Sequence, residues 1–321
     1  MKEPLFSVVV PTFNRAHVLG STIDSVLAQT FRDFELIVVD DGSTDASAEI
    51  AASYGEKITL LRQANQGPGP ARNTGAKHSS GRYIAFLDSD DLWFPWTLET
   101  YADAITRHPH ASALGGAITL FHRSEEVVEV TRTSLETQLY QDYLSTYPVI
   151  MCRGSGVTVF RADVFRQAEG FPDHALYCED LDLLLSICTS PGFVYLEQPV
   201  LTALRRHQRN SLSEVDRTYE GTMYLLRREA NDVYPGGLAR RQERMRLLRS
   251  HLWAVVKHTL EDGRFLAGTL LYLRYVQIFR SQLEASELRF IARAVKTALR
   301  RLFARRDAKV SANALCPAAR S

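Results

Sequence analysis

The sequence predicts an α/β fold in which a sheet is flanked by helices and followed by a helical C-terminal extension. Three observations lead to this expectation. Short apolar runs, rich in β-branched residues, recur in the first hundred residues at 6–10, 36–39, 58–61 and 83–87. Segments with helical features separate these runs, at 17–29, 44–54 and 71–78. From about residue 213 onward the pattern is mainly helical.

Strands that alternate with helices are joined by right-handed crossovers, so they form a mostly parallel sheet. We expect Pro11 to end the first strand. In such sheets ligands bind beyond the carboxyl ends of the strands. Polar side chains gather at three of these ends, namely Thr12 and Asn14, Asp40 and Asp41, and the run 88–91. The sequence therefore predicts a binding site at this edge.

The middle of the chain mixes the two kinds of signal. We expect strands at 117–121 and 157–160, and helices at 163–167 and 181–190. This pattern favours one domain over residues 1–212 and a helical region over residues 213–321.

The composition is that of an ordinary globular protein. The 321 residues are 45% hydrophobic and 23% charged, and the net charge of +1 does not point to a nucleic-acid partner. The four cysteines lack metal-ligand spacing, so we expect reduced thiols in a cytoplasmic protein. We see neither a signal peptide nor an apolar run long enough to span a bilayer.

An acidic turn follows the fourth predicted strand. Asp88, Asp90 and Asp91 lie within four residues, and carboxylates that close repel one another. A divalent cation would relieve the repulsion, and oxygen ligands suit Mg²⁺ or Mn²⁺. The alternative interpretation is a solvated acidic turn without a ligand.

The second predicted strand ends in two further carboxylates. Asp40 and Asp41 can accept hydrogen bonds from a nucleotide base or a ribose, and Gly42 allows a tight turn beside them. The alternative is a turn that leads into a helix cap, and we favour that interpretation for Asp45.

An arginine follows the Gly/Pro-rich loop at 65–70. Arg72 could bind a phosphate or a carboxylate through two parallel hydrogen bonds. A structural ion pair is the alternative.

A pair of acids precedes the apolar stretch at 181–190. One of these acids, Glu179 or Asp180, could be a general base that the helix start holds in a fixed position. The alternative is that the helix dipole simply favours acids at this position. His207 lies further along in a basic loop at 204–211.

Taken together, these segments resemble glycosyltransferase family 2, whose nucleotide-sugar-binding fold is called GT-A and is Rossmann-like. The order and spacing of the segments carry the resemblance, which covers about residues 5–213. The matching segments are 8–15, 38–45, 65–75, 83–91, 160–161, 170–171, 179–183 and 206–211. The resemblance implies a nucleotide-sugar half at about 1–110 and an acceptor half at about 111–212.

The resemblance also implies roles for single residues. Asp41 looks like the carboxylate that recognises the nucleobase, and Pro11 and Thr12 would line the nucleotide site. Asp88 looks like the ribose-side acid of a D-x-D motif, and Asp90 looks like the metal ligand that bridges to the diphosphate. Asp180 looks like the catalytic base, and Glu179 would orient the site. The remaining expected contacts are Asn14, Asp40, Arg72 and Ser89 to the nucleotide-sugar and His207 to the metal or diphosphate.

The implied reaction is a metal-dependent, inverting sugar transfer from a nucleotide-sugar, with UDP favoured, to an acceptor hydroxyl. One base and one Mn²⁺ or Mg²⁺ ion suffice for such a single displacement. The resemblance suggests a carbohydrate or lipid-linked acceptor in bacterial cell-surface polysaccharide or glycolipid synthesis. The alternatives are a sugar nucleotidyltransferase and a non-catalytic nucleotide-sugar binding protein.

The C-terminal tail is basic. Between residues 289 and 309 eight residues are Lys or Arg and one is acidic, and apolar residues recur there at helical spacing. Such a helix could lie on an anionic membrane from the cytoplasmic side. Alternatively, its apolar face packs on the protein and its cations are solvated.

Overall fold

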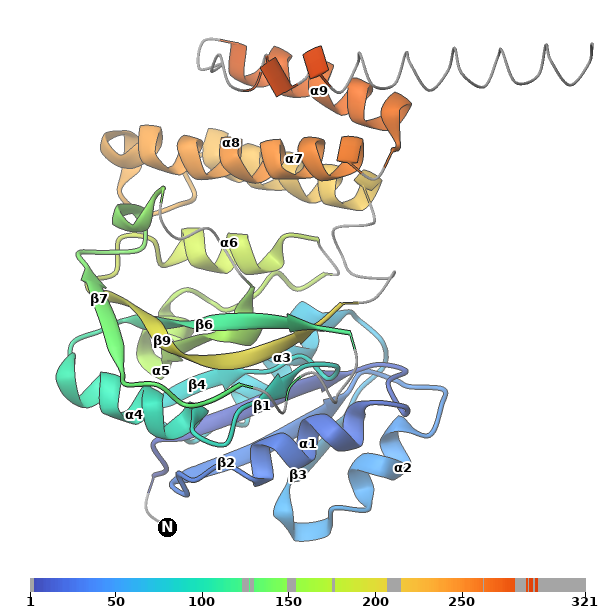
Figure 1. The fold of residues 1–321 in the computed structure, drawn as a ribbon, viewed down its shortest axis with the longest axis vertical. Helices are drawn as coiled ribbons and strands as arrows, with labels where there is room; N and C mark the ends of the chain where they lie inside the picture. The colour runs from blue at the N-terminus through green and yellow to red at the C-terminus, as the bar shows by residue number, and fades with distance from the viewer. Residues whose placement is uncertain are drawn as a thin grey trace, which may run out of the picture.

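A computed structural model describes residues 3–122, 127, 130–148, 154–174, 177–206, 215–261, 263–280, 287, 289–290 and 292–293. Within these residues a nine-stranded sheet is flanked by helices, and three further helices form a layer at one end of the molecule (Figure 1). The predicted fold class is therefore confirmed, including the helical C-terminal region. No helix in this part of the chain is both long and apolar enough to cross a membrane.

The N-terminal half is the parallel part of the sheet. Its strands lie in the order β3-β2-β1-β4, and all neighbours are parallel. The strands are β1 (Phe6–Thr12), β2 (Phe34–Asp40), β3 (Thr59–Arg62) and β4 (Tyr83–Phe86). The connecting elements are α1 (Leu19–Leu27), α2 (Ser47–Ala52), the 3₁₀ turn η1 (Gly55–Lys57) and α3 (Pro68–Lys77). Each element except η1, which lies between the predicted segments 44–54 and 58–61, overlaps a segment that the sequence predicted.

Pro11 does not end β1, contrary to our expectation, because the strand continues to Thr12. The carbonyl of Val9 accepts a hydrogen bond from Leu87 on the β4 side. Pro11, two residues later, faces the same side, but β4 does not extend that far. A proline is tolerated there because its missing N–H would have no strand partner.

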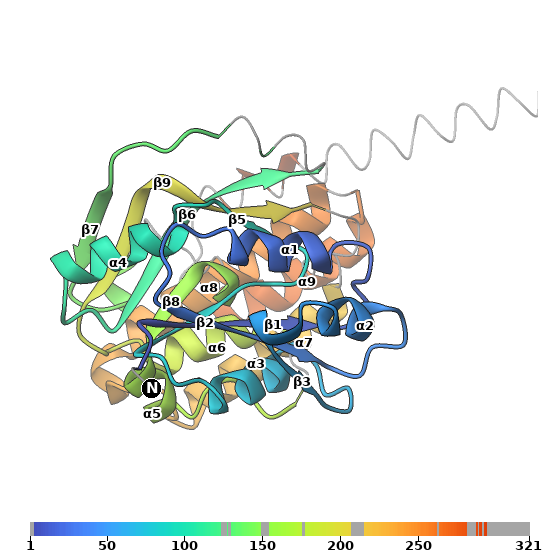
Figure 2. The same cartoon turned by 90° about the horizontal axis from the view of Figure 1, so that it is seen from below.

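Both faces of the parallel strands are buried, which explains their continuous apolar runs. Val9, Ile37 and Phe86 belong to a cluster on the side of α3 and α6, whereas Val8 and Val38 belong to a second cluster with residues of α1 and α4. Figure 2 shows helices on the two sides of these strands.

The second half of the sheet mixes directions. β6 runs parallel to β9, whereas β8 is antiparallel to β4 and β6, and β5 and β7 are antiparallel to β9. The strands are β5 (Leu92–Trp93), β6 (Ala113–Phe121), β7 (Glu136–Tyr140), β8 (Thr158–Arg161) and β9 (Phe193–Arg205). The helices are α4 (Thr97–Arg107), α5 (Ala162–Gln167) and α6 (Glu179–Ser186), with 3₁₀ turns η3 (Leu144–Thr146) and η4 (Ser155–Val157). The sheet is thus mostly parallel only in its N-terminal half.

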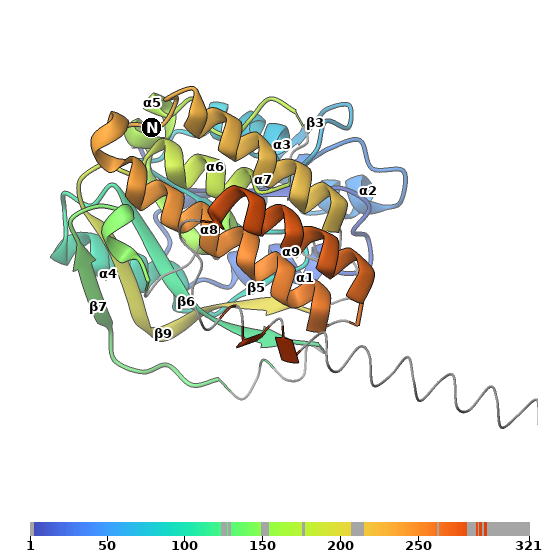
Figure 3. The same ribbon diagram turned by 90° about the horizontal axis from the view of Figure 1, so that it is seen from above.

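The C-terminal helices form the end layer. They are α7 (Val215–Ala230), α8 (Gly237–Glu261) and α9 (Phe265–Phe279). Leu225 of α7 and Leu248 of α8 share a hydrophobic cluster with Leu184 of α6. α9 packs on the outer side of α8, as Figure 3 shows from above. The helical region therefore continues the core that supports α6.

Candidate active site

The acidic turn after β4 is held by α3 and by β9. Asp88 Oδ1 accepts a 2.6 Å hydrogen bond from Arg72 Nη2 of α3. Asp91 is buried and its Oδ1 accepts from the backbone N–H of Arg205 at 2.7 Å. Burial, followed by the charges of Asp88 and Asp90, raises the pKa of Asp91 well above its usual range. Asp91 therefore anchors the turn to β9, while Asp88 and Asp90 remain at the site.

The loop after β1 meets the same turn. Arg15 Nε lies 3.2 Å from Asp90 Oδ2, and the backbone N–H of Arg15 donates to Ser47 Oγ. The carbonyl of Ser89 accepts a hydrogen bond from Thr22 Oγ1, and this bond connects the turn to α1. The carboxyl ends of β1 and β4 are thereby joined, as the parallel arrangement predicts.

Arg72 is the buried centre of a charge cluster. Its Nη1 donates to Glu179 Oε1 at 3.0 Å and lies 3.9 Å from Asp180 Oδ1, and its Nη2 pairs with Asp88. Its guanidinium also lies 5.3 Å from the ring centroid of Phe171. Burial acts to lower the pKa of Arg72, but the neighbouring carboxylates outweigh it and the pKa is raised. Arg72 therefore links the end of β4 to the start of α6.

The two acids at the start of α6 have different surroundings. Burial and the nearby Asp180 raise the pKa of Glu179 to about 7, although Arg72 acts in the opposite direction. Asp180 Oδ1 is buried and accepts no hydrogen bond from the described residues. An oxygen in this position can accept a proton from an incoming group without first losing a hydrogen bond.

A glycine-containing turn lies against these carboxylates. A Cβ added to Gly154 would lie 3.3 Å from Asp180 Oδ2, and one added to Gly156 would lie 3.5 Å from Asp88 Oδ2. Between them, Ser155 has a buried Oγ without a partner in the described structure. No role was predicted for this turn from the sequence, although two glycines that flank a serine indicate a close backbone approach.

The end of β2 is also closely packed. Asp41 Oδ1 accepts from the N–H of Gln66 at 3.0 Å, and its Oδ2 accepts from the N–H of Gly67 at 2.8 Å. Asp40 is fully buried and pairs with Arg62 at 3.2 Å. Both carboxylates therefore shape the loop that leads into α3.

Residues at the end of β1 complete this region. Asn14 has a left-handed backbone with φ 53°, and its Oδ1 accepts from the N–H of Thr44 at 2.8 Å. Thr12 is buried, and its Oγ1 has no partner within the described structure. Pro11, which precedes Thr12 in β1, is also buried. The predicted nucleotide-side residues thus occupy adjoining loops.

The C-terminal helices support the loop that carries Glu179 and Asp180. Cys178 precedes them with a left-handed backbone, φ 77°, and its Sγ lies 3.1 Å from Nε2 of His251 on α8. A Cβ at Gly221 of α7 would collide with the carbonyl oxygen of Tyr177. This support was not predicted, because it joins residues far apart in the sequence.

A metal ion bound at this turn would find few protein ligands among the described residues. Among the described residues no three His, Cys, Asp or Glu side chains form a metal site, and His207 lies outside them. Mg²⁺ is commonly held by one or two carboxylates together with substrate phosphates, and Mn²⁺ prefers the same hard oxygen ligands. Asp88 and Asp90 fit that kind of site.

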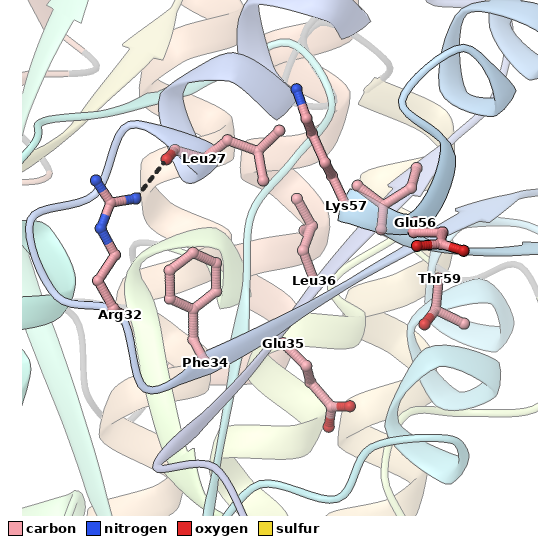
Figure 4. Close-up of a pocket in the computed structure, with 9 residues that line it drawn as sticks. Leu27, Arg32, Phe34, Glu35, Leu36, Glu56, Lys57 and Thr59 are labelled. Carbon is pink, nitrogen blue, oxygen red and sulfur yellow. Dashed lines mark hydrogen bonds between the residues drawn. The ribbon is translucent and has the colours of Figure 1, made fainter.

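The surface hollow shown in Figure 4 lies at the amino ends of β2 and β3, away from the carboxyl ends that carry the predicted site residues. Phe34, at the start of β2, and Thr59, at the start of β3, line it. It contains none of the predicted site residues, so the candidate site is the cluster at the carboxyl ends.

Comparison with known proteins identifies the family. Residues 7–168 match the model of Glycosyl transferase family 2. An uncharacterized glycosyltransferase of Rickettsia prowazekii is 30% identical over 242 residues, which cover 71% of this chain and 74% of that protein. An uncharacterized glycosyltransferase of Haemophilus influenzae is 27% identical and covers 67% and 72% of the two chains. The chain therefore belongs to glycosyl transferase family 2, and the protein is a glycosyltransferase.

Solved structures agree with the fold. TarS of S. aureus, crystallised with UDP-GlcNAc, has a TM-score of 0.59 at 20% identity and covers 90% of this chain and 79% of its own. The mannosyltransferase PcManGT of Pyrobaculum calidifontis, in complex with GDP-Man and Mn²⁺, has a TM-score of 0.54 at 17% identity, with coverages of 93% and 88%. At these identities the likeness is one of fold.

Proposed function

We propose that this glycosyltransferase moves a sugar from a nucleoside-diphosphate sugar, with UDP as the nucleotide, to an acceptor hydroxyl with inversion at the anomeric carbon. One observation carries the proposal. Arg72 holds Asp88, from the acidic turn, and Glu179, from the start of α6, against the same buried guanidinium. The proposed donor-side acid and the neighbour of the proposed base Asp180 thus contact one guanidinium at the carboxyl end of the parallel sheet, which supports a single site for donor and acceptor.

The donor is proposed to lie along the ends of β1, β2 and β4. Pro11, Thr12 and Asn14 would form one wall, and the loop shaped by Asp40 and Asp41 the other. Thr12 Oγ1 has no hydrogen-bond partner among the described residues, which supports this placement, since a buried hydroxyl that lacks a partner is costly unless a ligand supplies one. Asp88 would contact the ribose through its carboxylate, beside the backbone of Ser89.

Asp180 is proposed as the general base. It would take the proton from the acceptor hydroxyl as that oxygen forms a bond to the anomeric carbon and the bond to the diphosphate breaks. Within the described residues Asp180 Oδ1 accepts no hydrogen bond and has only a long 3.9 Å ion pair with Arg72, which supports this role. Glu179, paired with Arg72, would position the base and the acceptor.

Asp90 is proposed to hold Mn²⁺ or Mg²⁺, with Asp88 beside it, and His207 would approach from the segment outside the described residues. The bound ion would stabilise the negative charge that develops on the leaving diphosphate. The complex of PcManGT with Mn²⁺ supports this assignment by analogy of fold. We propose an acceptor that is a carbohydrate or a lipid-linked sugar of the bacterial cell envelope.

The deciding experiment measures product release with a panel of UDP- and GDP-sugars. We expect release of nucleoside diphosphate that depends on Mn²⁺ or Mg²⁺ and increases when a suitable acceptor is added. Release of pyrophosphate from a nucleoside triphosphate and a sugar phosphate would instead identify a sugar nucleotidyltransferase. Donor binding without turnover across a broad acceptor panel would identify a non-catalytic binding protein.

A further inference from the structure

The outermost helix, α9, is apolar on two opposite sides. Its inner side contains Gly268, Leu271, Tyr275 and Phe279, which are buried where α9 packs on α8. Its outer side exposes Leu266 by 78%, Leu270 by 53% and Leu273 by 59%. These three leucines follow a spacing of four and three residues, so they form one stripe along the helix.

The stripe differs from the other exposed apolar side chains. The described protein exposes eight large apolar side chains, and three of them are these leucines. The other five are scattered over separate places, namely Phe13, Leu120, Leu139, Val233 and Leu238. Single exposed leucines need no explanation, whereas a contiguous apolar surface on an outermost helix points to a partner.

The charge around the stripe indicates which partner. The segment 263–283 contains no acidic residue, and Arg264, Arg274 and Arg280 are all exposed. The guanidinium of Arg274 lies 4.5 Å from the ring centroid of Tyr219 on α7, so it faces the protein. Arg280 follows Leu273 by seven residues and therefore lies on the same side of the helix. The sequence that continues from α9 is also strongly basic, with eight Lys or Arg and one acid between residues 289 and 309. An apolar stripe edged by cations is complementary to an anionic lipid surface.

The dimensions of α9 fix the mode of contact. Its fifteen residues measure roughly 22 Å, which is shorter than the hydrocarbon core of a bilayer. Its inner side is moreover occupied by α8. Only the outer side can enter the interface, so the helix would lie parallel to the membrane plane.

We propose that the outer surface of α9, formed by Leu266, Leu270 and Leu273 with Arg280 on the same side, docks on the surface of an anionic lipid bilayer. The three leucines enter the boundary between headgroups and acyl chains, and Arg280 binds a lipid phosphate. This inference does not depend on the identity of the donor, the base or the metal. It would bring the enzyme to the surface at which a lipid-linked acceptor is found.

The test uses the full chain and two variants with three substitutions each. The first combines Leu266→Ser, Leu270→Ser and Leu273→Ser. The matched control combines Leu120→Ser, Leu139→Ser and Leu238→Ser, which remove three exposed leucines from three other elements. Partition onto phosphatidylglycerol and phosphatidylcholine vesicles is measured by co-sedimentation at two salt concentrations, together with the melting temperature and the rate of nucleoside diphosphate release.

We expect the wild-type and control proteins to bind phosphatidylglycerol vesicles, more weakly at high salt, and to bind phosphatidylcholine poorly. The α9 variant should lose at least about tenfold in partition, because its apolar contact area is removed. Its melting temperature and its turnover of soluble substrates should match the control. Equal binding of both variants, or failure of the wild type to bind, would overturn the proposal. A wild-type dimer that the α9 substitutions dissociate would assign the stripe to a second copy of the chain instead.

Discussion

Arg15, in the loop after β1, forms an ion pair with Asp90, in the turn after β4, at 3.2 Å between Nε and Oδ2. The proposed metal ligand is therefore already neutralised by a cation from a neighbouring loop. The two side chains are 34% and 17% exposed, so solvent screens the pair and its strength is modest. A divalent ion that arrives with a diphosphate can replace Arg15 at the carboxylate.

The first prediction concerns Asp90. We expect Asp90→Asn to reduce metal-stimulated turnover by about 100-fold or more, because the ion that stabilises the leaving group loses its carboxylate ligand. The free energy of unfolding should change by less than about 1 kcal/mol, since the lost pair is partly exposed. The measurements are nucleoside diphosphate release across a Mn²⁺ titration and chemical denaturation.

Asp163→Asn is the matched control, because Asp163 forms an exposed pair with Arg161 at 2.7 Å. This variant should leave the Mn²⁺ titration unchanged. If Asp90→Asn responds to Mn²⁺ as the wild type does, Asp90 is not the metal ligand.

The second prediction concerns the buried charge cluster. Arg72→Met leaves Asp88, Glu179 and Asp180 without their common partner in a buried site. Removing one member of a buried ion pair typically costs about 3–5 kcal/mol, so we expect a loss of this size in the free energy of unfolding. Arg72→Lys should recover part of the lost stability. An ammonium restores the charge, but it lacks the two separate N–H groups with which the guanidinium binds Glu179 and Asp88.

Urea denaturation measures these differences. Arg161→Met, which breaks an exposed pair, provides the comparison and should change stability by less than about 1 kcal/mol. A stability of Arg72→Met equal to that of Arg161→Met would mean that the cluster does not hold the fold together.

The third prediction is a pH dependence that arises from His251. Burial lowers the pKa of His251 to about 4, against about 6.5 in an unfolded chain. Between these values the unfolded state binds a proton that the folded state does not, so stability falls as pH decreases from 6.5 to 4. The contribution of this one group approaches 1.4 kcal/mol per pH unit within the window.

Denaturation of the wild type and His251→Gln at several pH values checks this prediction. The variant should lose the corresponding part of the slope, whereas His110→Gln, at an exposed site, should keep it. An unchanged slope in His251→Gln would show that the imidazole is protonated in the folded protein.

The sequence predicted those features that local spacing encodes. The four parallel strands, the acidic turn at Asp88 and a helix beside Glu179 each follow from a short apolar run and the polar residues next to it. That helix was predicted at 181–190 and is observed at Glu179–Ser186. β9 was not predicted, and its pairing with β6 is interrupted by register shifts. A strand of this kind lacks the regular alternation on which sequence reasoning depends.

Contacts over long sequence distances could not be predicted. Arg15 and Asp90 are 75 residues apart, and Cys178 and His251 are 73 apart. Nothing in the spacing of either pair requires them to meet, because the meeting is set by how α8 and the β1 loop pack. The hydrogen bonds that Asp41 accepts from the loop at 66–67 could not be predicted for the same reason.

The fourth prediction separates the two acids at the start of α6. We expect Asp180→Asn to lower the transfer rate by about 10²–10⁴-fold, because an amide cannot accept the proton of the acceptor hydroxyl. Donor affinity should change little, since the base addresses the acceptor. Glu179→Gln, the neighbouring substitution of the same kind, should have a smaller effect and should act mainly on acceptor binding.

The pH profile of the transfer rate decides between the two carboxylates. Burial and the charge of Asp180 raise the pKa of Glu179 to about 7. If Glu179 were the base, the rate would rise with pH through about 7, and Glu179→Gln would abolish both the rate and this rise. If Asp180 is the base, Glu179→Gln retains most of the transfer rate. Asp180→Asn loses this rate, whereas isothermal titration calorimetry still detects donor binding to the variant. A larger loss in Glu179→Gln than in Asp180→Asn would therefore transfer the catalytic role to Glu179.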